Sequence, residues 1–234
     1  MNQTTLNLIA ISIFVITMTS LLGPWLHVSP AVPAIATTTL LALAALDYFG
    51  WQGRGGTLLV DWFEQRSSLH RDRVVRHEAG HFLVARLLDI PVTGYALSAW
   101  DAWKQGIPGR GGVVFDDREL TAELQRGSLS PVMLERYCKV WMAGIAAEQL
   151  VYDTVEGGGD DRQRLYTALS LLKVSTADGT QKERGAILQA RTLLQTHWSA
   201  YEALVTAMAE KATVEDCDRI ISTHLEPQIP KDEP

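Results

Sequence analysis

Charged side chains are divided very unevenly along this chain of 234 residues. All 21 lysines and arginines follow residue 50, and Asp47 is the single charged side chain before that point. Ionised side chains are costly in lipid, whereas they cover the surface of water-soluble domains, so the two parts of the chain suit different solvents. The sequence therefore predicts an N-terminal membrane segment followed by a water-exposed domain.

The N-terminal part contains two apolar stretches separated by a short connector. Residues 6–26 and 31–51 each match the roughly 20 residues that a helix needs to cross a bilayer. The connector, GPWLHVSP, has Gly and Pro where a tight turn needs them. A cleaved signal peptide is the alternative for the first stretch, but this stretch lacks a basic start and a second span follows directly. We expect residues 1–51 to form a transmembrane hairpin.

The arginines around these spans predict their orientation. The connector has no Lys or Arg, whereas several arginines follow the second span closely, namely Arg54, Arg66, Arg71, Arg73 and Arg76. The positive-inside rule then places the C-terminal domain on the cytoplasmic, or stromal-equivalent, side of an integral membrane protein. Some aromatic side chains suit the bilayer surface, although each could also pack within the domain: Trp25, Tyr48, Trp51 and Trp62.

The rest of the chain is predicted to be mainly α-helical with one short strand. Helical patterns cover residues 69–88, 131–151, the segment from Asp160, residues 182–210, and a last helix to about Leu225 that Thr213 and Asp216 cap. Residues 112–115 follow a Gly-rich stretch and have the composition of a strand. We expect a linker over 52–69, a helical domain over 70–225 and a disordered tail over 226–234.

Several function classes are disfavoured by what the sequence lacks. The net charge is −6, and no basic patch with interleaved aromatics points to nucleic acid. No GxxxxGK[ST] segment is present, so we expect no nucleotide-binding loop of that kind. The two cysteines, Cys138 and Cys217, are far apart and form no CxxC, which predicts buried reduced thiols and not a disulfide or thiolate zinc site.

The segment HEAGH, residues 77–81, carries the strongest chemical pattern. In a helix, His77 and His81 lie about 40° apart on one side, so both imidazoles can reach one Zn²⁺ ion at the ~2.0–2.1 Å of zinc–nitrogen bonds. Glu78 points about 60° away from His81. There its carboxylate suits a general base that takes a proton from metal-bound water. Gly80 in mid-helix suggests close packing. The alternative is a pair of core histidines hydrogen-bonded to the backbone.

Further segments extend this pattern. HEAGH, GGVVF and MAGIAAEQLVYDTVEGGGDD follow one another in an order and spacing that resemble the protease domain of the FtsH-type membrane zinc metalloproteases. The resemblance covers about residues 70–222 and implies a helical, zincin-type protease domain. It implies that the two histidines of HEAGH bind zinc, that its glutamate is the general base, and that Asp161 is the third protein ligand. Asp160 stands where the family has Asn, which leaves open which aspartate binds.

The same resemblance bears on three other features. It implies a supporting role for Glu148, with an exposed helical glutamate as the alternative. It implies that the strand at 112–115 offers its edge to an extended substrate. FtsH-type enzymes also carry an ATP-driven unfolding domain, and the roughly twenty residues between Trp51 and His70 cannot contain one.

These observations lead to one main functional hypothesis. We expect a membrane-anchored zinc metalloendopeptidase that cleaves unfolded or membrane-associated polypeptides, either as a homo-oligomer or with ATPase-bearing FtsH-type proteins. The alternative is a non-catalytic membrane subunit that modulates a protease complex. An intramembrane protease is disfavoured because arginines flank HEAGH closely on both sides.

Overall fold

The computed structural model of the protein describes residues 3–64, 67–107, 111–127 and 129–225. The described residues are mainly helical, as the sequence predicts, and they contain a small two-stranded sheet where the sequence predicts one short strand. The chain divides into two compact units, Met1–Ser67 and Ser68–Pro234, which we call the N-terminal unit and the C-terminal unit.

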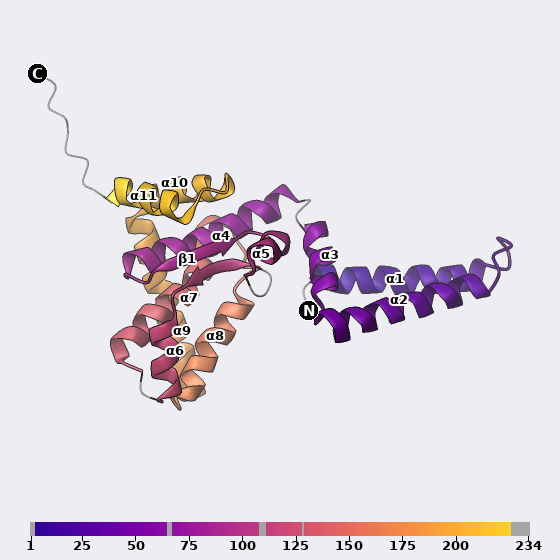
Figure 1. Ribbon diagram of the computed structural model, residues 1–234, viewed down its shortest axis with the longest axis horizontal. Coiled ribbons are helices and arrows are strands. Elements are labelled where there is room, and N and C mark those ends of the chain that lie inside the picture. The colour runs from indigo at the N-terminus through magenta and orange to yellow at the C-terminus, as the bar shows by residue number, and fades with distance from the viewer. Residues whose placement is uncertain (1–2, 65–66, 108–110, 128, 226–234) are drawn as a thin grey trace, which may run out of the picture. The chain divides into compact units, whose positions relative to one another are not determined.

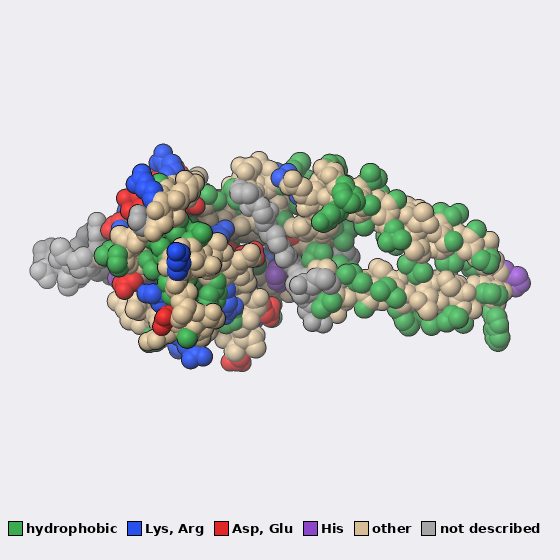
Figure 2. Space-filling model, turned by 90° about the horizontal axis from the view of Figure 1, so that it is seen from below, with side chains coloured by type: hydrophobic (Ala, Val, Ile, Leu, Met, Phe, Trp, Pro, Cys, Tyr) green, Lys and Arg blue, Asp and Glu red, His purple; other side chains and the backbone are tan. Residues whose placement is uncertain are grey.

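Two long antiparallel helices dominate the N-terminal unit, α1 (Gln3–Leu22) and α2 (Ala31–Trp51) (Figure 1). Both are long and apolar enough to cross a membrane, and little of either is buried inside the protein. Figure 2 shows apolar side chains along this part and charged side chains gathered over the other unit. Several hydroxyls donate to the carbonyl four residues earlier, which satisfies these donors within their own helix: Ser12, Thr19, Ser20, Thr37 and Thr38.

The predicted linker over 52–69 contains a third helix, α3 (Arg54–Glu64), which packs against α2 and α1. Its first turn is capped from outside the segment, because the carboxylate of Asp47 in α2 accepts hydrogen bonds from the backbone N–H groups of Gly55 and Gly56. A cap that comes from another helix leaves no local sequence signal. This helix was therefore absent from the sequence prediction.

The centre of the C-terminal unit is formed by α4 (Ser68–Leu87), α7 (Pro131–Val151) and α9 (Thr176–Thr196). Helices α4 and α7 approach closely at Gly80, where an added Cβ would lie 2.8 Å from both the carbonyl oxygen of Ala143 and the Cβ of Ala147. The close packing expected at this glycine is confirmed.

The sheet pairs β1 (Val92–Ala96) with β2 (Gly112–Phe115) in antiparallel register, with Tyr95 opposite Val113. The strand predicted over 112–115 is confirmed. Helix α5 (Ala99–Gln105) lies in the connection between the strands, and α6 (Arg118–Gln125) follows β2. Strand β2 contacts α4, the helix that carries HEAGH.

Three helices complete the C-terminal unit: α8 (Gly159–Leu171), α10 (Trp198–Ala209) and α11 (Val214–Leu225). The prediction of one helix over 182–210 is wrong, because the backbone leaves helical geometry at His197, between α9 and α10 (φ −112°, ψ 37°). The predicted capping pair is confirmed, since the N–H of Asp216 donates to the hydroxyl of Thr213 at 3.2 Å. The tail predicted over 226–234 lies outside the described residues.

Candidate metal centre

His77 and His81 lie one turn apart on α4, and both are buried. Their Nε2 atoms are 3.1 Å apart, and the two rings meet edge to face. The four-residue spacing in a helix brings the rings together, as the sequence predicts.

Hydrogen bonds on the far side of each ring fix its tautomer. His81 Nδ1 lies 2.7 Å from the carbonyl oxygen of Val140, which can only accept, so Nδ1 carries the hydrogen. His77 Nδ1 lies 2.7 Å from a carboxylate oxygen of Glu148 and donates in the same way. In the neutral imidazoles, both Nε2 atoms therefore present lone pairs to the space between the rings.

Asp161 brings a carboxylate to the same space from the first turn of α8. Its Oδ2 atom lies 3.1 Å from His77 Nε2 and 3.4 Å from His81 Nε2. The preceding Asp160 is exposed and is not part of the cluster. Of the two aspartates that the sequence left open, the geometry brings Asp161 to the histidines.

These three atoms fit a metal ion. They form a triangle with sides of 3.1, 3.1 and 3.4 Å. Two ligands of a tetrahedral ion with bonds of about 2.05 Å are roughly 3.3 Å apart. Three acceptors at this separation repel one another unless a cation lies among them. The cluster could therefore hold a metal ion, with two imidazole nitrogens and one carboxylate oxygen as its ligands.

The protonation equilibria of the cluster also favour positive charge. Burial lowers the pKa of His77, but hydrogen bonds to Asp161 and Glu148 outweigh burial and raise it to about 10. Burial raises the pKa of Asp161, but the neighbouring His81 and His77 outweigh it and hold this pKa well below its ordinary value. A proton can thus supply the positive charge when no metal is bound, and a metal ion would displace it.

Glu148 is the residue that orients His77. Its side chain is only 1% exposed. Its Oε1 atom accepts from His77 Nδ1 and from the N–H of Gly157, and its Oε2 atom accepts from Arg73 and from the N–H of Glu156. Burial raises the pKa of Glu148, but these hydrogen bonds outweigh burial and lower it to about 2. The exposed alternative is excluded, and Glu148 is a buried carboxylate that supports the histidine.

Two glycines make room for this arrangement. An added Cβ at Gly144 would lie 2.3 Å from His77 Nε2, and one at Gly157 would lie 2.5 Å from Glu148 Oε1. The sequence pattern gave no indication that Gly144, Gly157 or Arg73 belongs to the site. The spacing of Gly144 and Glu148, four residues apart and so on one face of α7, is the signal that could have indicated the first of these.

Glu78 is half-buried and lies beside the cluster on α4. Its Oε2 atom accepts a hydrogen bond of 2.9 Å from the N–H of Val113 in β2. Its negative charge contributes to the raised pKa of His77, which is consistent with a position close to that ring. The structure thus joins the expected general base to the strand expected to receive substrate.

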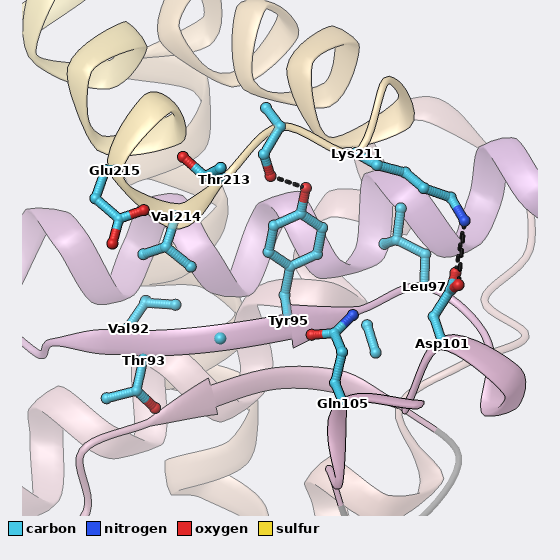
Figure 3. Close-up of a pocket in the computed structure, with 13 residues that line it drawn as sticks. Val92, Thr93, Tyr95, Leu97, Asp101, Gln105, Lys211, Thr213, Val214 and Glu215 are labelled. Carbon is cyan, nitrogen blue, oxygen red and sulfur yellow. Dashed lines mark hydrogen bonds and ion pairs between the residues drawn. The ribbon is translucent and has the colours of Figure 1, made fainter. Parts of the chain in front are cut away.

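A separate groove of about 610 Å³ lies between β1 and the turn from α10 to α11 (Figure 3). Tyr95 points across it and donates to the carbonyl of Ala212, and Lys211 pairs with Asp101 at its end. None of the metal-cluster residues lines this groove. These contacts occupy the polar ends of Tyr95, Asp101 and Lys211, and the one group of potential metal ligands found among the described residues lies outside the groove.

The structure brings together every residue that the sequence assigned to the metal site and places the predicted base beside them. No protein family matches this chain, and no curated protein sequence matches it.

Proposed function

We propose that the protein is a membrane-anchored, zinc-dependent endopeptidase, similar to the proteolytic half of the FtsH-type proteases. The observation that carries the proposal is the convergence of three acceptor atoms, from His77, His81 and Asp161, at the spacing of ligands on one ion. Two nitrogens and one oxygen suit Zn²⁺, and three protein ligands leave one position for water or substrate, as catalytic zinc sites require.

The residues around the site support hydrolysis of peptide bonds. Bound zinc would supply a polarised carbonyl and a more acidic water. Glu78 would take the proton of that water and later give it to the leaving amine. The N–H of Val113 holds the carboxylate of Glu78, which limits its rotation. Glu148 holds His77 in the tautomer that leaves Nε2 free for the ion.

The two-stranded sheet supports a polypeptide substrate. An extended segment can add to an exposed strand edge through backbone hydrogen bonds, which makes recognition tolerant of side-chain sequence. Strand β2 is suited to this role because it contacts α4 beside Glu78. Unfolded or flexible segments are therefore the proposed substrates.

The N-terminal helices α1 and α2 support a membrane anchor, and the arginines after α2 favour the cytoplasmic or equivalent side for the C-terminal unit. The C-terminal unit carries no nucleotide-binding motif of the Walker A type. We infer that any ATP-driven unfolding is supplied by a partner with an ATPase domain, in a shared assembly.

The test compares purified wild-type protein, Glu78→Gln and Glu119→Gln in detergent with casein as the substrate. Glu119 is an exposed carboxylate on α6 and serves as the matched control. We expect about one zinc per chain in all three. Cleavage by wild type and by Glu119→Gln should be abolished by chelator and unchanged by ATP, and Glu78→Gln should be inactive. Equal cleavage by Glu78→Gln, or zinc far below one per chain, would overturn the proposal and favour a non-catalytic subunit.

A further inference from the structure

The corner between α2 and α3 is built around one carboxylate. Asp47 accepts from the N–H of Gly55 at 2.7 Å through Oδ1 and from the N–H of Gly56 at 2.8 Å through Oδ2. An added Cβ at Gly55 would lie 2.8 Å from Asp47 Oδ1, so a side chain there would displace the carboxylate from its position in the corner. The only charged residue among the first fifty is thus used to fix the direction of the next helix.

Helix α3 is amphipathic and leaves apolar side chains uncovered. Leu59 and Trp62, three residues apart on one face, are 55% and 54% exposed. The polar side chain of Asp61 is buried instead. In a helix that faces water, leucine and tryptophan side chains are normally buried and aspartate side chains exposed, so this pattern of burial is reversed.

The position of α3 in the chain identifies what covers this face. It begins three residues after Trp51, where α2 ends, and it belongs to the same compact unit as α1 and α2. Trp51 and Tyr48 are 69% and 70% exposed at this end of α2. Tryptophan and tyrosine favour the boundary between lipid headgroups and acyl chains. Where the hairpin spans a bilayer, this end of it lies at a bilayer surface.

We propose that α3 is an interfacial helix, which lies in the headgroup region of the bilayer with Leu59 and Trp62 directed into lipid. The inference rests on the membrane anchoring in the proposed function and adds a defined lipid-binding surface to it. Asp47 sets the angle of α3 by capping it, and the amphipathic face supplies the affinity for lipid.

This placement has a consequence for substrate choice. Only three residues separate the end of α3 from the start of α4, the helix that carries the metal cluster. An α3 held in lipid therefore restricts the catalytic unit to the membrane surface. Its substrates are polypeptide segments that emerge from the bilayer or lie against it, and soluble segments are cleaved mainly when delivered there.

The test uses nitroxide labels in the full chain, reconstituted in vesicles of phosphatidylcholine and phosphatidylglycerol. Single labels replace Leu59 in α3, Phe14 in α1 and Leu188 in α9, all of which are exposed. The native cysteines are buried and stay unlabelled in the folded protein. Collision rates with oxygen, which dissolves in lipid, and with a nickel chelate, which stays in water, give the depth of each label.

We expect the label at Leu59 to lie between the lipid-embedded label at Phe14 and the aqueous label at Leu188, with nickel accessibility severalfold below the latter. An aqueous label at Leu59 beside a lipid-embedded one at Phe14 would overturn the interfacial helix while leaving the membrane anchor intact. Aqueous labels at both positions would overturn the anchor and the inference together.

A second variant tests the corner itself. Asp47→Ala removes both acceptors, and we expect the label at Leu59 to gain mobility and nickel accessibility. Asp47→Asn keeps one acceptor oxygen and should lie between Asp47→Ala and wild type. Unchanged spectra in Asp47→Ala would contradict the role of this carboxylate in holding α3.

Discussion

Replacing Glu148 by Gln provides a sharp test of how the metal centre is built. Each carboxylate oxygen of Glu148 accepts two hydrogen bonds, one pair from His77 and Gly157 and the other from Arg73 and Glu156. A glutamine has one acceptor oxygen, and its NH₂ group would face two donors in place of the other. The substitution keeps the volume of the side chain but breaks half of this network.

The contacts of Glu148 indicate how much stability and how much zinc affinity the substitution should remove. Arg73 is buried and would lose its buried carboxylate partner, and breaking a buried charge pair from one side costs about 3–5 kcal/mol. His77 would lose part of the support that fixes its tautomer, and removing such support for a metal ligand typically lowers metal affinity about 10–100-fold. We expect both losses in Glu148→Gln.

The assays are a zinc competition titration with a chromophoric chelator and urea unfolding of the metal-free protein. Glu156→Gln is the matched control, because its side chain is 61% exposed and lies 3.4 Å from Arg73. Because the Glu156 carboxylate stays in water, its ion pair with Arg73 is worth at most about 1 kcal/mol, and this control should change neither stability nor zinc affinity much. The folded pKa of Glu148, about 2, lies below its ordinary value, so its contribution is full above about pH 4.5 and declines as pH falls towards 2. The difference in free energy of unfolding between wild type and Glu148→Gln should therefore become smaller as the pH falls from about 4.5 towards 2.

Two results would refute this reasoning. If Glu148→Gln bound zinc as tightly as Glu156→Gln, Glu148 would not be what orients His77. If Glu148→Gln lost as much affinity as Asp161→Asn, Glu148 would be a direct ligand, contrary to its position on the Nδ1 side of the ring.

Three further predictions follow from single contacts. In Gly144→Ala the new methyl group would lie 2.3 Å from His77 Nε2, the nitrogen that faces the ion, so we expect zinc affinity to fall about 100-fold. The control is Gly185→Ala, which has open space around it and should leave zinc affinity unchanged in the same titration. Asp161→Asn should lower zinc affinity at least about 100-fold, and Asp160→Asn, which changes an exposed neighbour, should match wild type; the reverse order would reassign the third ligand. Burial raises the pKa of both cysteine thiols to about 11, so a thiol reagent at pH 7.5 should leave the native protein unmodified. The same reagent should modify two thiols per chain in guanidinium chloride. Rapid labelling of the native protein would contradict the burial of these cysteines.

Most of the long helices and the first two ligands could be predicted from sequence because they depend on local spacing. The pairing of His77 and His81 needs only one turn of helix, and strand β2 follows a Gly-rich stretch of sequence. Asp161 lies eighty residues beyond His81, so no local rule joins them, and only the order of motifs along the chain suggested it.

What sequence could not supply depended on contacts between distant elements. Helix α3 was missed because its cap, Asp47, belongs to α2. The break at His197 was missed because the apolar pattern continues from α9 into α10 while the backbone turns between them. The burial of Glu148 follows from its partners on α4 and in the loop before α8, and neither is visible in the sequence of α7 alone.

One stripe of α7 explains why both histidines of the cluster point the same way. Val140, Gly144 and Glu148 are spaced four residues apart and therefore lie along one face of that helix. The carbonyl of Val140 accepts a hydrogen bond from His81. Gly144 leaves room for the ring of His77, and the carboxylate of Glu148 accepts a hydrogen bond from that ring. Since each residue turns an α-helix by 100°, one residue inserted within this stripe would direct at least one of these contacts away from α4. The metal centre is thus specified as much by the register of α7 against α4 as by the ligands themselves.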